Sequence, residues 1–299
     1  MKSETTDKFS IQLAEKAQFV NGLLNRLLAK QSGIDSDLKE AISYTLEAPG
    51  KRIRSALVLW SCEAICGSIN RNAEIASAAI EMVHTYSLVH DDLPAMDNDD
   101  FRRGLPTCHR AFDEATAILA GDGLLTLAFE ILSKEIDKPD IAVKLISELA
   151  RAAGPAGMVA GQMADLKAEK TKGGAELLEY IHTNKTAKMF AAASAMGAIA
   201  GGGSDIEYRS LCEYGLKIGL GFQIADDILD VSGSSEQLGK TAGKDARTAK
   251  CTYPAVVGME KSKELENKLA NEAITALQMF GERADNLRHL AMALLERTK

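Results

Sequence analysis

The sequence predicts an all-α protein, and three observations support this fold class. Apolar residues recur at helical spacing through much of the chain, as in residues 19–28 and 287–296. The chain has only six prolines, and none lies between Pro155 and Pro254, so long helices can run without interruption. Alternating runs of β-branched residues joined by hairpin turns are hard to find. We therefore expect many helices of moderate length.

Helix boundaries are predicted where Gly, Pro, Ser and Asp residues gather. These breaks are residues 31–36, 47–52, the segment after Asp92, 137–140, 169–174, 201–205 and 232–251. None of them has the composition of a linker between domains. We expect one helical domain, residues 1–299.

The overall composition excludes several classes of protein. A net charge of −7 argues against nucleic acid as the main partner, because binding a phosphate backbone needs basic patches. The first residues contain no apolar run, and no stretch approaches the roughly 20 uncharged apolar residues of a membrane span, so we predict neither a secretory signal nor membrane insertion. The five cysteines are odd in number and scattered, which predicts a reducing, cytosolic location, and Cys62 and Cys66, four residues apart, are expected to be buried thiols.

The segment DDILD is one of two aspartate clusters that could form a functional site. Asp226 and Asp230 are four residues apart, so on a helix they share one face, with Asp227 beside them. Like charges placed this way destabilise a helix unless something positive lies against them. Residues 214–225, directly before the cluster, have the pattern of a continuous apolar helix. We therefore expect the three carboxylates near the end of that helix.

The other cluster, HDDLPAMDNDD at residues 90–100, contains a proline. Asp91 and Asp97 are six residues apart, about 600° of rotation on an ideal helix, and would point to different sides. Pro94 lacks an N–H group and its ring clashes with the preceding turn, which favours a helix end. We predict that Asp91 and Asp92 end a helix and that Asp97 folds back towards them.

Two aspartate clusters on facing helix ends would form an oxygen-lined site for hard cations. Magnesium suits such a site, because it is commonly held by one or two carboxylates together with phosphate oxygens of a substrate. The alternative is a pair of solvated acidic segments. A calcium-binding EF-hand over residues 97–108 does not fit, since Phe101 and Cys108 stand where oxygen ligands are needed.

Basic groups accompany the aspartates. They are Lys51, Arg52 and Arg54 before an apolar helix, Arg102 and Arg103 just after the first cluster, and Lys240 and Lys244 after the second. Fixed cations and helix N-termini bind phosphate groups. Each group alone is as consistent with surface ion pairs, but together with the carboxylates they indicate a site for more than one phosphate group.

Taken in order, these segments resemble the trans-prenyltransferases, or polyprenyl synthetases. The resemblance rests on GKRIR, HDDLPAMDNDDFRRGLPTCH, GFQIADDILD and the downstream GKTAGKD and TYP, and it runs from about residue 49 to residue 254. Bacterial-type farnesyl diphosphate synthases are the most similar members. Pro49 and Ser55 depart from the family pattern, in which a glycine and a proline are more usual around GKRIR.

The resemblance implies a helical bundle around a deep central cavity, usually homodimeric, with three Mg²⁺ ions in the active site. The metal-binding residues would be Asp91, Asp92, Asp97, Asp226 and Asp230, with Asp227 in the second motif. The residues near the allylic diphosphate would be Arg102, Lys185, Thr186, Gln223 and Lys240. Those near isopentenyl diphosphate would be Lys51, Arg54, His84 and Arg103. Gln162 and Asp165 match a further motif near the metals.

The implied reaction joins isopentenyl diphosphate to dimethylallyl and then geranyl diphosphate, giving farnesyl diphosphate. Tyr86 lies five residues before Asp91, about 7.5 Å along a helix axis, where a phenol would block a hydrocarbon chain that points away from the metals. The pair Tyr86–Ser87 resembles the farnesyl-forming pattern. The alternative for Tyr86 is simple packing in the core.

Other functions remain open at this point. Within the family, a geranyl or geranylgeranyl diphosphate synthase fits the same motifs. A class I terpene cyclase would use similar aspartate motifs but no second diphosphate pocket. A metal-dependent phosphohydrolase, suggested by His84 and His90, would leave DDILD without a role. A non-catalytic subunit of a heteromeric synthase would be expected to lack one aspartate motif.

Overall fold

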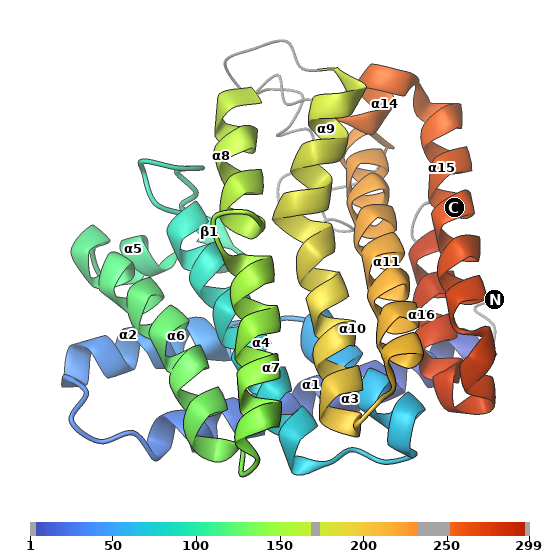
Figure 1. The fold of residues 1–299 in the computed structure, drawn as a ribbon. Helices are drawn as coiled ribbons and strands as arrows, with labels where there is room; N and C mark the ends of the chain where they lie inside the picture. The colour runs from blue at the N-terminus through green and yellow to red at the C-terminus, as the bar shows by residue number, and fades with distance from the viewer. Residues whose placement is uncertain (1–3, 169–173, 233–251, 297–299) are drawn as a thin grey trace.

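The structure is a computed structural model that describes residues 4–168, 174–232 and 252–296. These residues form the helical bundle that the sequence predicts (Figure 1). The helices of the first half are α1 (Glu4–Ala29), α2 (Ser36–Glu47), α3 (Ile53–Cys66), α4 (Arg71–Asp91), α5 (Cys108–Ala111), α6 (Glu114–Glu135) and α7 (Pro139–Ala153). Those of the second half are α8 (Met158–Ala168), α9 (Ala175–Ile181), α10 (Lys188–Gly201), α11 (Asp205–Ser232), α14 (Tyr253–Val257), α15 (Met259–Ala276) and α16 (Asp285–Glu296). A π-helical turn, η1 (His182–Ala187), joins α9 to α10, and a 3₁₀ segment, η2 (Gln278–Ala284), precedes α16.

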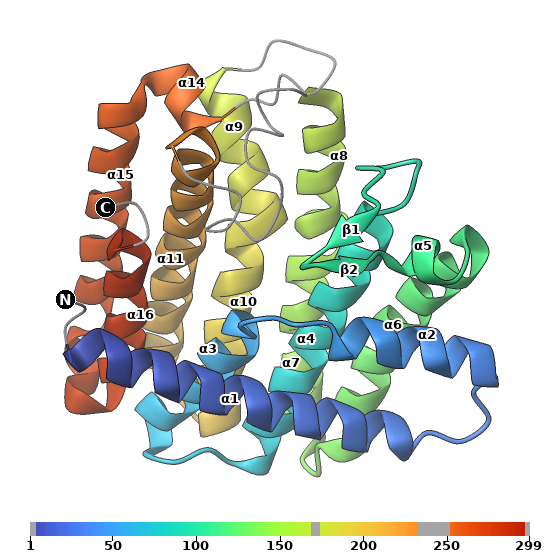
Figure 2. The same ribbon diagram turned by 180° about the vertical axis from the view of Figure 1, so that it is seen from behind.

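The longer helices run alongside one another, while α1 and α2 cross them on one side, as Figure 2 shows from behind. Helices α4 and α11 end at the same end of the bundle, and α9 lies beside α8 and α11 at that end (Figures 1 and 2). This arrangement matters for function because the two aspartate clusters lie at the C-terminal ends of α4 and α11.

The core is built around α3 and α10, whose side chains are buried on nearly every face. Helix α10 packs against α3, α4, α7 and α11, so it holds the two halves of the bundle together. One large cluster of buried apolar residues extends from α1 to α16, with Trp60, Phe190 and Tyr214 among its largest members. Truncating a fully buried side chain of this size costs about 3–5 kcal/mol of folding free energy.

Helices begin or end at the predicted breaks 31–36, 47–52, 137–140 and 201–205 and after Asp92, whereas the boundaries at 67–70 and 112–113 were not predicted. The predicted breaks at 169–174 and 232–251 lie almost entirely outside the described residues. The carboxylate of Asp35 accepts hydrogen bonds from the first turn of α2, and Asn70 and Asp113 cap α4 and α6 in the same way. Pro139 stands in the first turn of α7, where its missing N–H is harmless.

Helix α6 is the one helix in the described ranges whose length and mean hydropathy would allow a membrane crossing, which the sequence analysis did not anticipate. It packs along α4, and its face towards the core includes Leu124, Leu127 and Leu132. One face of the helix is therefore buried in the core, while Ile118 and Leu119 are exposed.

Two features differ from the sequence analysis. Cys62 is buried as predicted, but Cys66 is exposed, because it is the last residue of α3 and the chain turns away at Gly67. A short antiparallel hairpin was also not predicted: β1 (Phe101–Arg102) pairs with β2 (Leu105–Pro106). Arg103 and Gly104 form its turn with φ angles of 54° and 80°, both in the left-handed region that a type I′ turn requires.

Candidate active site

The first aspartate cluster has the backbone path that Pro94 predicts. Helix α4 ends at Asp91, and Asp92 forms its C-cap. The chain then turns back, so that the N–H of Asp97 donates to the carbonyl of Asp91 at 2.8 Å. The N–H of Asp99 donates to the carbonyl of Asp92 at 3.2 Å. The turn therefore holds Asp97 against the end of α4, as expected.

Arg102 of the hairpin forms a two-pronged ion pair with Asp92. Its Nε donates to both carboxylate oxygens at 2.8 and 2.9 Å, and its Nη2 donates to Oδ1 at 2.6 Å. Burial raises the pKa of Asp92, and the guanidinium opposes that rise. The pKa of Arg102 is raised because the carboxylate outweighs the effect of burial. The guanidinium thus favours the ionised carboxylate, and the pair fixes the hairpin beside the cluster.

Arg52 and Arg54, from the basic segment at the start of α3, have different surroundings. The side chain of Arg52 is almost fully buried, where Nη1 donates to Glu81 at 3.1 Å and Nε donates to Asn21 at 2.8 Å. The hydroxyl of Ser55 lies 2.6 Å from the other oxygen of Glu81. Arg52 is therefore part of the scaffold, although the sequence analysis grouped it with the phosphate-binding candidates.

Arg54 points in a different direction from Arg52. Its guanidinium carbon lies 4.7 Å from the centre of the Phe190 ring, and Nη1 lies 3.3 Å from Nε2 of His84. Since the arginine can only donate, Nε2 of His84 accepts and is not protonated. Burial, then the nearby arginines, lowers the pKa of His84, which keeps the ring neutral at pH 7. The buried Nε of Arg54 donates to no acceptor within the described residues.

Lys185 stands on the π-helical turn η1, a kind of irregularity that is frequent at functional sites. Its Nζ donates to Oδ2 of Asp165 on α8 at 2.7 Å. Gly161, one turn before Asp165, makes this contact feasible: a Cβ there would lie 2.1 Å from the backbone nitrogen of Lys185. The sequence predicts Lys185 and Asp165 separately, and the structure brings them together. Thr186 beside them is buried.

Gln162 lies on α8 between Gly161 and Asp165. Both polar atoms of its side chain are buried, and neither has a hydrogen-bond partner in the part of the chain that the structure describes. A buried amide of this kind is suited to meet a polar ligand.

The second aspartate cluster lies near the end of α11, as predicted. Asp230 is 5% exposed, and Asp226, Asp227 and Gln223 are half-buried. The Oδ2 atom of Asp227 accepts a hydrogen bond from the N–H of Tyr253 at 2.9 Å and lies 3.8 Å from Nε2 of His182. Asp227 therefore ties α11 to the start of α14 and to η1.

Each aspartate cluster interacts electrostatically with a cation from another helix or turn, Asp91 with Lys185 and Asp226 with Arg54. Burial raises the pKa of Asp91 to about 6, the neighbouring carboxylates add to the rise, and Lys185 opposes it. Burial lowers the pKa of Arg54 to about 10, while Glu81 and Asp226 oppose that change. Lys185 on η1 therefore favours the ionised form of Asp91, and Asp226 favours the charged form of Arg54 on α3. Both interactions are expected if the two clusters face one site.

The aspartate oxygens of the two clusters could hold magnesium only together with oxygen atoms from a bound phosphate compound. Within the described residues, no group of three or more His, Cys, Asp and Glu side chains converges on a point that could hold a metal. The aspartates supply oxygen donors in small numbers at each helix end, which is the way Mg²⁺ is usually held together with phosphate oxygens. The residues thus fit a metal that is shared with a diphosphate.

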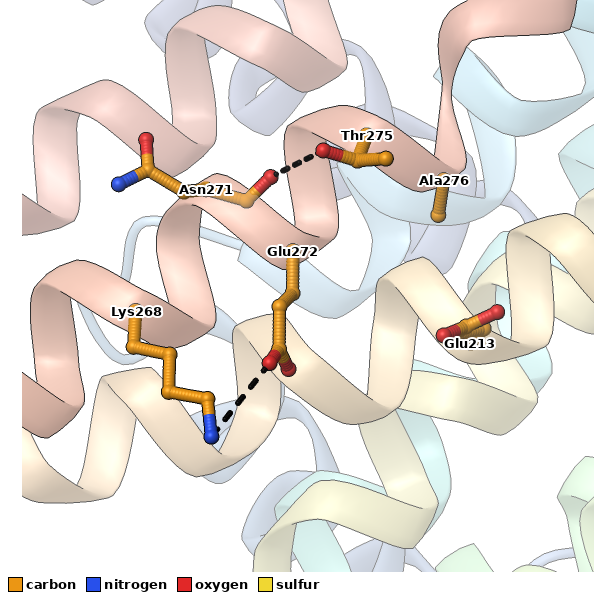
Figure 3. A pocket seen from close by; sticks show the side chains of 6 residues that line it. All are labelled: Glu213, Lys268, Asn271, Glu272, Thr275 and Ala276. Atoms are coloured by element: carbon orange, nitrogen blue, oxygen red, sulfur yellow. Dashed lines mark hydrogen bonds and ion pairs between the residues drawn. The ribbon is translucent and has the colours of Figure 1, made fainter.

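Two pockets lie at different places. A small pocket of ≈ 40 Å³ between α2, α4 and the hairpin is lined in part by Arg52, His84, Asp92, Arg102 and Arg103. A pocket of ≈ 550 Å³ lies between α11 and α15, where Figure 3 shows Glu213, Lys268 and Glu272 among its lining residues. The second pocket contains none of the predicted site residues. The deep central cavity that the resemblance implies stays a prediction.

Some of the predicted phosphate-binding residues are exposed or lie outside the described ranges. Lys51 and Arg103 are exposed, and Arg103 donates to the carbonyl of Pro49 at 2.7 Å. Lys240 and Lys244 lie outside the described residues. Glu81 and His182 were not predicted from the sequence, although a glutamate between the apolar residues Ile80 and Met82 was a usable signal for a buried ion pair.

The matching family model is the polyprenyl synthetase model, which spans residues 35–289. The chain belongs to the polyprenyl synthetase family. It is 46% identical over 278 residues to geranylgeranyl pyrophosphate synthase 3, chloroplastic, of Arabidopsis thaliana, covering 91% of this chain and 76% of that one. Family and relatives support short-chain trans-prenyltransferase activity, and the fold is the all-α fold of isoprenoid synthases.

Solved structures of family members agree with this fold. A farnesyl/geranylfarnesyl diphosphate synthase from Zymomonas mobilis is 37% identical with a TM-score of 0.86, covering 97% of this chain and 99% of that one. A geranyltransferase from Helicobacter pylori, complexed with magnesium and isoprenyl diphosphate, is 33% identical with a TM-score of 0.81, covering 99% and 98%.

Proposed function

We propose that this polyprenyl synthetase makes farnesyl diphosphate by magnesium-dependent head-to-tail condensation of isopentenyl diphosphate with dimethylallyl and then geranyl diphosphate. The observation that carries the proposal is that α4 and α11, which bear the two aspartate clusters at their C-terminal ends, finish at one end of the bundle. Lys185 interacts electrostatically with Asp91, and Arg54 with Asp226. A diphosphate needs such a mixture of carboxylate-held metal and fixed cations.

The allylic diphosphate would bind at the aspartate clusters. Asp91, Asp92 and Asp97 from one side and Asp226 and Asp230 from the other would hold three Mg²⁺ ions. The fixed cations on that diphosphate would be Lys185, Arg102 and Lys240. When bound, magnesium neutralises the charge on the departing diphosphate and so lowers the barrier to ionisation.

Isopentenyl diphosphate would bind beside α3 and the hairpin. Its phosphate oxygens would meet Lys51, Arg54, His84 and Arg103. The buried Nε of Arg54 is a donor ready for an acceptor, and the neutral His84 holds the guanidinium in place. This second basic group is what distinguishes the proposed reaction from that of a class I terpene cyclase, which ionises one diphosphate and needs no second pocket.

The reaction would proceed in three steps: ionisation, condensation and elimination. The allylic C–O bond breaks, and the diphosphate leaves with the electron pair. The double bond of isopentenyl diphosphate then attacks the allylic cation and forms the new C–C bond. A proton is lost from the neighbouring carbon to restore a double bond, and the released diphosphate is the proposed acceptor. Oxygen atoms of Thr186 and Gln223 would face the cation.

We propose that Tyr86 sets the product length; it is 8% exposed and lies on α4, five residues before Asp91. A hydrocarbon chain that grows away from the metals along α4 would meet this ring, with Ser87 beside it, after three isoprene units. Geranylgeranyl diphosphate is the second candidate product, because the Arabidopsis relative is named a geranylgeranyl pyrophosphate synthase.

We also propose that the enzyme is a homodimer in the cytosol. Helix α6 exposes Ile118 and Leu119, which are 44% and 56% accessible on an otherwise strongly apolar helix. A second copy that covers this face would remove both side chains from water. Sedimentation analysis tests the dimer, and a monomer at micromolar concentration would contradict it.

Incubation of the protein with dimethylallyl diphosphate, excess isopentenyl diphosphate and Mg²⁺ tests the proposed function. Chromatography of the dephosphorylated products should give farnesol as the main alcohol, and EDTA should abolish it. Geranylgeraniol as the main alcohol would favour the second candidate. Inorganic phosphate or a cyclic hydrocarbon without chain elongation would contradict the proposal.

A further inference from the structure

The rings of Tyr86 and His90 pack edge to face one turn apart on α4. Their centroids are 5.7 Å apart and their planes meet at 86°. Edge-to-face contact is one of the favoured arrangements of neighbouring rings, because the positive edge of one meets the negative face of the other. His90 therefore restricts the orientation of the Tyr86 phenol.

His90 is itself fixed by α6. Its Nε2 lies 3.0 Å from the carbonyl oxygen of Ile118. A carbonyl can only accept, so Nε2 carries the proton and donates it. The same nitrogen lies 3.8 Å from Oδ1 of Asp122. The imidazole thus spans the interface between α4 and α6 and couples Tyr86 to the backbone of α6.

Gly121 provides the space for this ring. A Cβ atom at residue 121 would lie 2.2 Å from Nε2 and 2.4 Å from Cδ2 of His90, which is closer than real Cβ contacts allow. Gly123, two residues further along α6, is different. A Cβ there would lie 3.2 Å from the end of the flexible Ile42 side chain. Alanine is therefore compatible with the observed His90 position at residue 123 and incompatible with it at residue 121.

We propose that His90 and Gly121 are positioning residues that determine product length by holding the Tyr86 ring across the path of the growing chain. The inference rests on the proposed function, since it assigns the control of the same condensation to a second helix. His90 acts through Tyr86 and not on the substrate. Without the imidazole, or without space for it, the phenol can turn aside and the chain can grow beyond C15.

The experiment compares product distributions from wild type, His90→Ala, Gly121→Ala, Tyr86→Ala and the double variant Tyr86→Ala/His90→Ala. Each is incubated with dimethylallyl diphosphate, excess isopentenyl diphosphate and Mg²⁺. His90→Ala and Gly121→Ala should each raise the ratio of C20 to C15 product about fivefold, as loss of one aromatic pair predicts. The double variant should match Tyr86→Ala alone. Gly123→Ala is the matched control, because it makes the same change in helix propensity without displacing His90.

Each contrary result has a distinct meaning. If Tyr86→Ala lengthens the product but His90→Ala and Gly121→Ala do not, the inference is wrong and the proposed function stands. Additive lengthening in the double variant, or equal lengthening in Gly123→Ala, would also overturn it. A wild type that makes C20 as its main product overturns the role of Tyr86 and with it this inference. A wild type without any elongated product overturns the proposed function itself. Should His90→Ala fail to fold, Gly121→Ala decides.

Discussion

The Nζ atom of Lys185 donates to Oδ2 of Asp165 at 2.7 Å, across the contact between the π-helical turn η1 and α8. Because Lys185 also opposes the rise in the pKa of Asp91, this ion pair connects α8 to the first aspartate cluster. Asp165 thereby holds the cation that we assign to the allylic diphosphate.

Asp165→Asn should weaken this hold and lower kcat/KM for the allylic substrate about 10- to 100-fold, because a misplaced cation stabilises the departing diphosphate less well. Steady-state kinetics with geranyl diphosphate as the varied substrate measure the effect. Lys188→Met is the matched control, since Lys188 follows the same turn but is bonded to the carbonyl of Ala156 on the outside. A value of kcat/KM within twofold of wild type for Asp165→Asn would show that Asp165 does not position Lys185 for catalysis.

The paired hydrogen bonds between Arg102 and Asp92 predict that Arg102→Lys is not a conservative change. A lysine cannot make both contacts, so the hairpin should lose its fixed position beside the aspartates that we propose to bind metal. We expect KM for the allylic substrate to rise about tenfold or more. Arg110→Lys is the control, because Arg110 pairs with Asp100 at 3.1 Å in a solvent-exposed position. Equal kinetics for the two variants would show that the two-pronged geometry is unimportant.

The raised pKa of Asp91 predicts a gain of stability when its charge is removed. The pKa rises from 3.8 to about 6, chiefly by burial and then by the carboxylate of Asp97. The folded protein therefore carries a cost for the ionised group that is complete above pH 6 and vanishes below pH 3.8. In EDTA, Asp91→Asn should be more stable than wild type by about 1–3 kcal/mol at pH 7.5.

Thermal or denaturant unfolding in EDTA at pH 7.5 and pH 4.5 measures this gain. The difference between Asp91→Asn and wild type should shrink at the lower pH, because wild-type Asp91 is then mostly protonated in the folded state. Asp100→Asn, an exposed change in the same loop, should alter stability by less than about 0.5 kcal/mol at either pH. An Asp91→Asn protein less stable than wild type at pH 7.5 would contradict the inferred cost.

The buried pair of Arg52 and Glu81 predicts a loss of stability and not of chemistry. Both side chains are 2% exposed, so removing one charge leaves the other without its partner in the core. Glu81→Gln should lower the free energy of unfolding by about 3 kcal/mol, as breaking a buried ion pair usually does. Glu74→Gln is the comparison, since its pair with Arg71 lies at the surface, with the two side chains 46% and 29% exposed, and contributes at most about 1 kcal/mol. Similar losses in the two variants would show that the buried pair is no stronger than the surface one.

Features that depend on local stereochemistry were predictable from the sequence. The return of Asp97 to the end of α4 follows from Pro94 and helical geometry, and the face shared by Asp226 and Asp230 follows from their spacing alone. The π-helical turn was not predictable, because residues 182–187 continue an ordinary helical pattern and the irregularity is seen only where η1 packs against its neighbours.

The separation of Arg52 from Arg54 could not be predicted either. Two arginines in one basic segment look alike, and only the position of Glu81 on another helix decides which of them is buried. The same holds for His90 and Gly121, whose relation depends on how α4 lies against α6. Sequence patterns thus indicate which residues could serve a site, while their pairing depends on the packing of helices.

A crystal structure with Mg²⁺ and an unreactive thio analogue of dimethylallyl diphosphate tests the central claim most directly. We predict a single diphosphate whose oxygens share magnesium ions with Asp91 and Asp97 on one side and with Asp226 and Asp230 on the other. A diphosphate bound elsewhere, or metal held by one aspartate cluster while the other faces solvent, would contradict it.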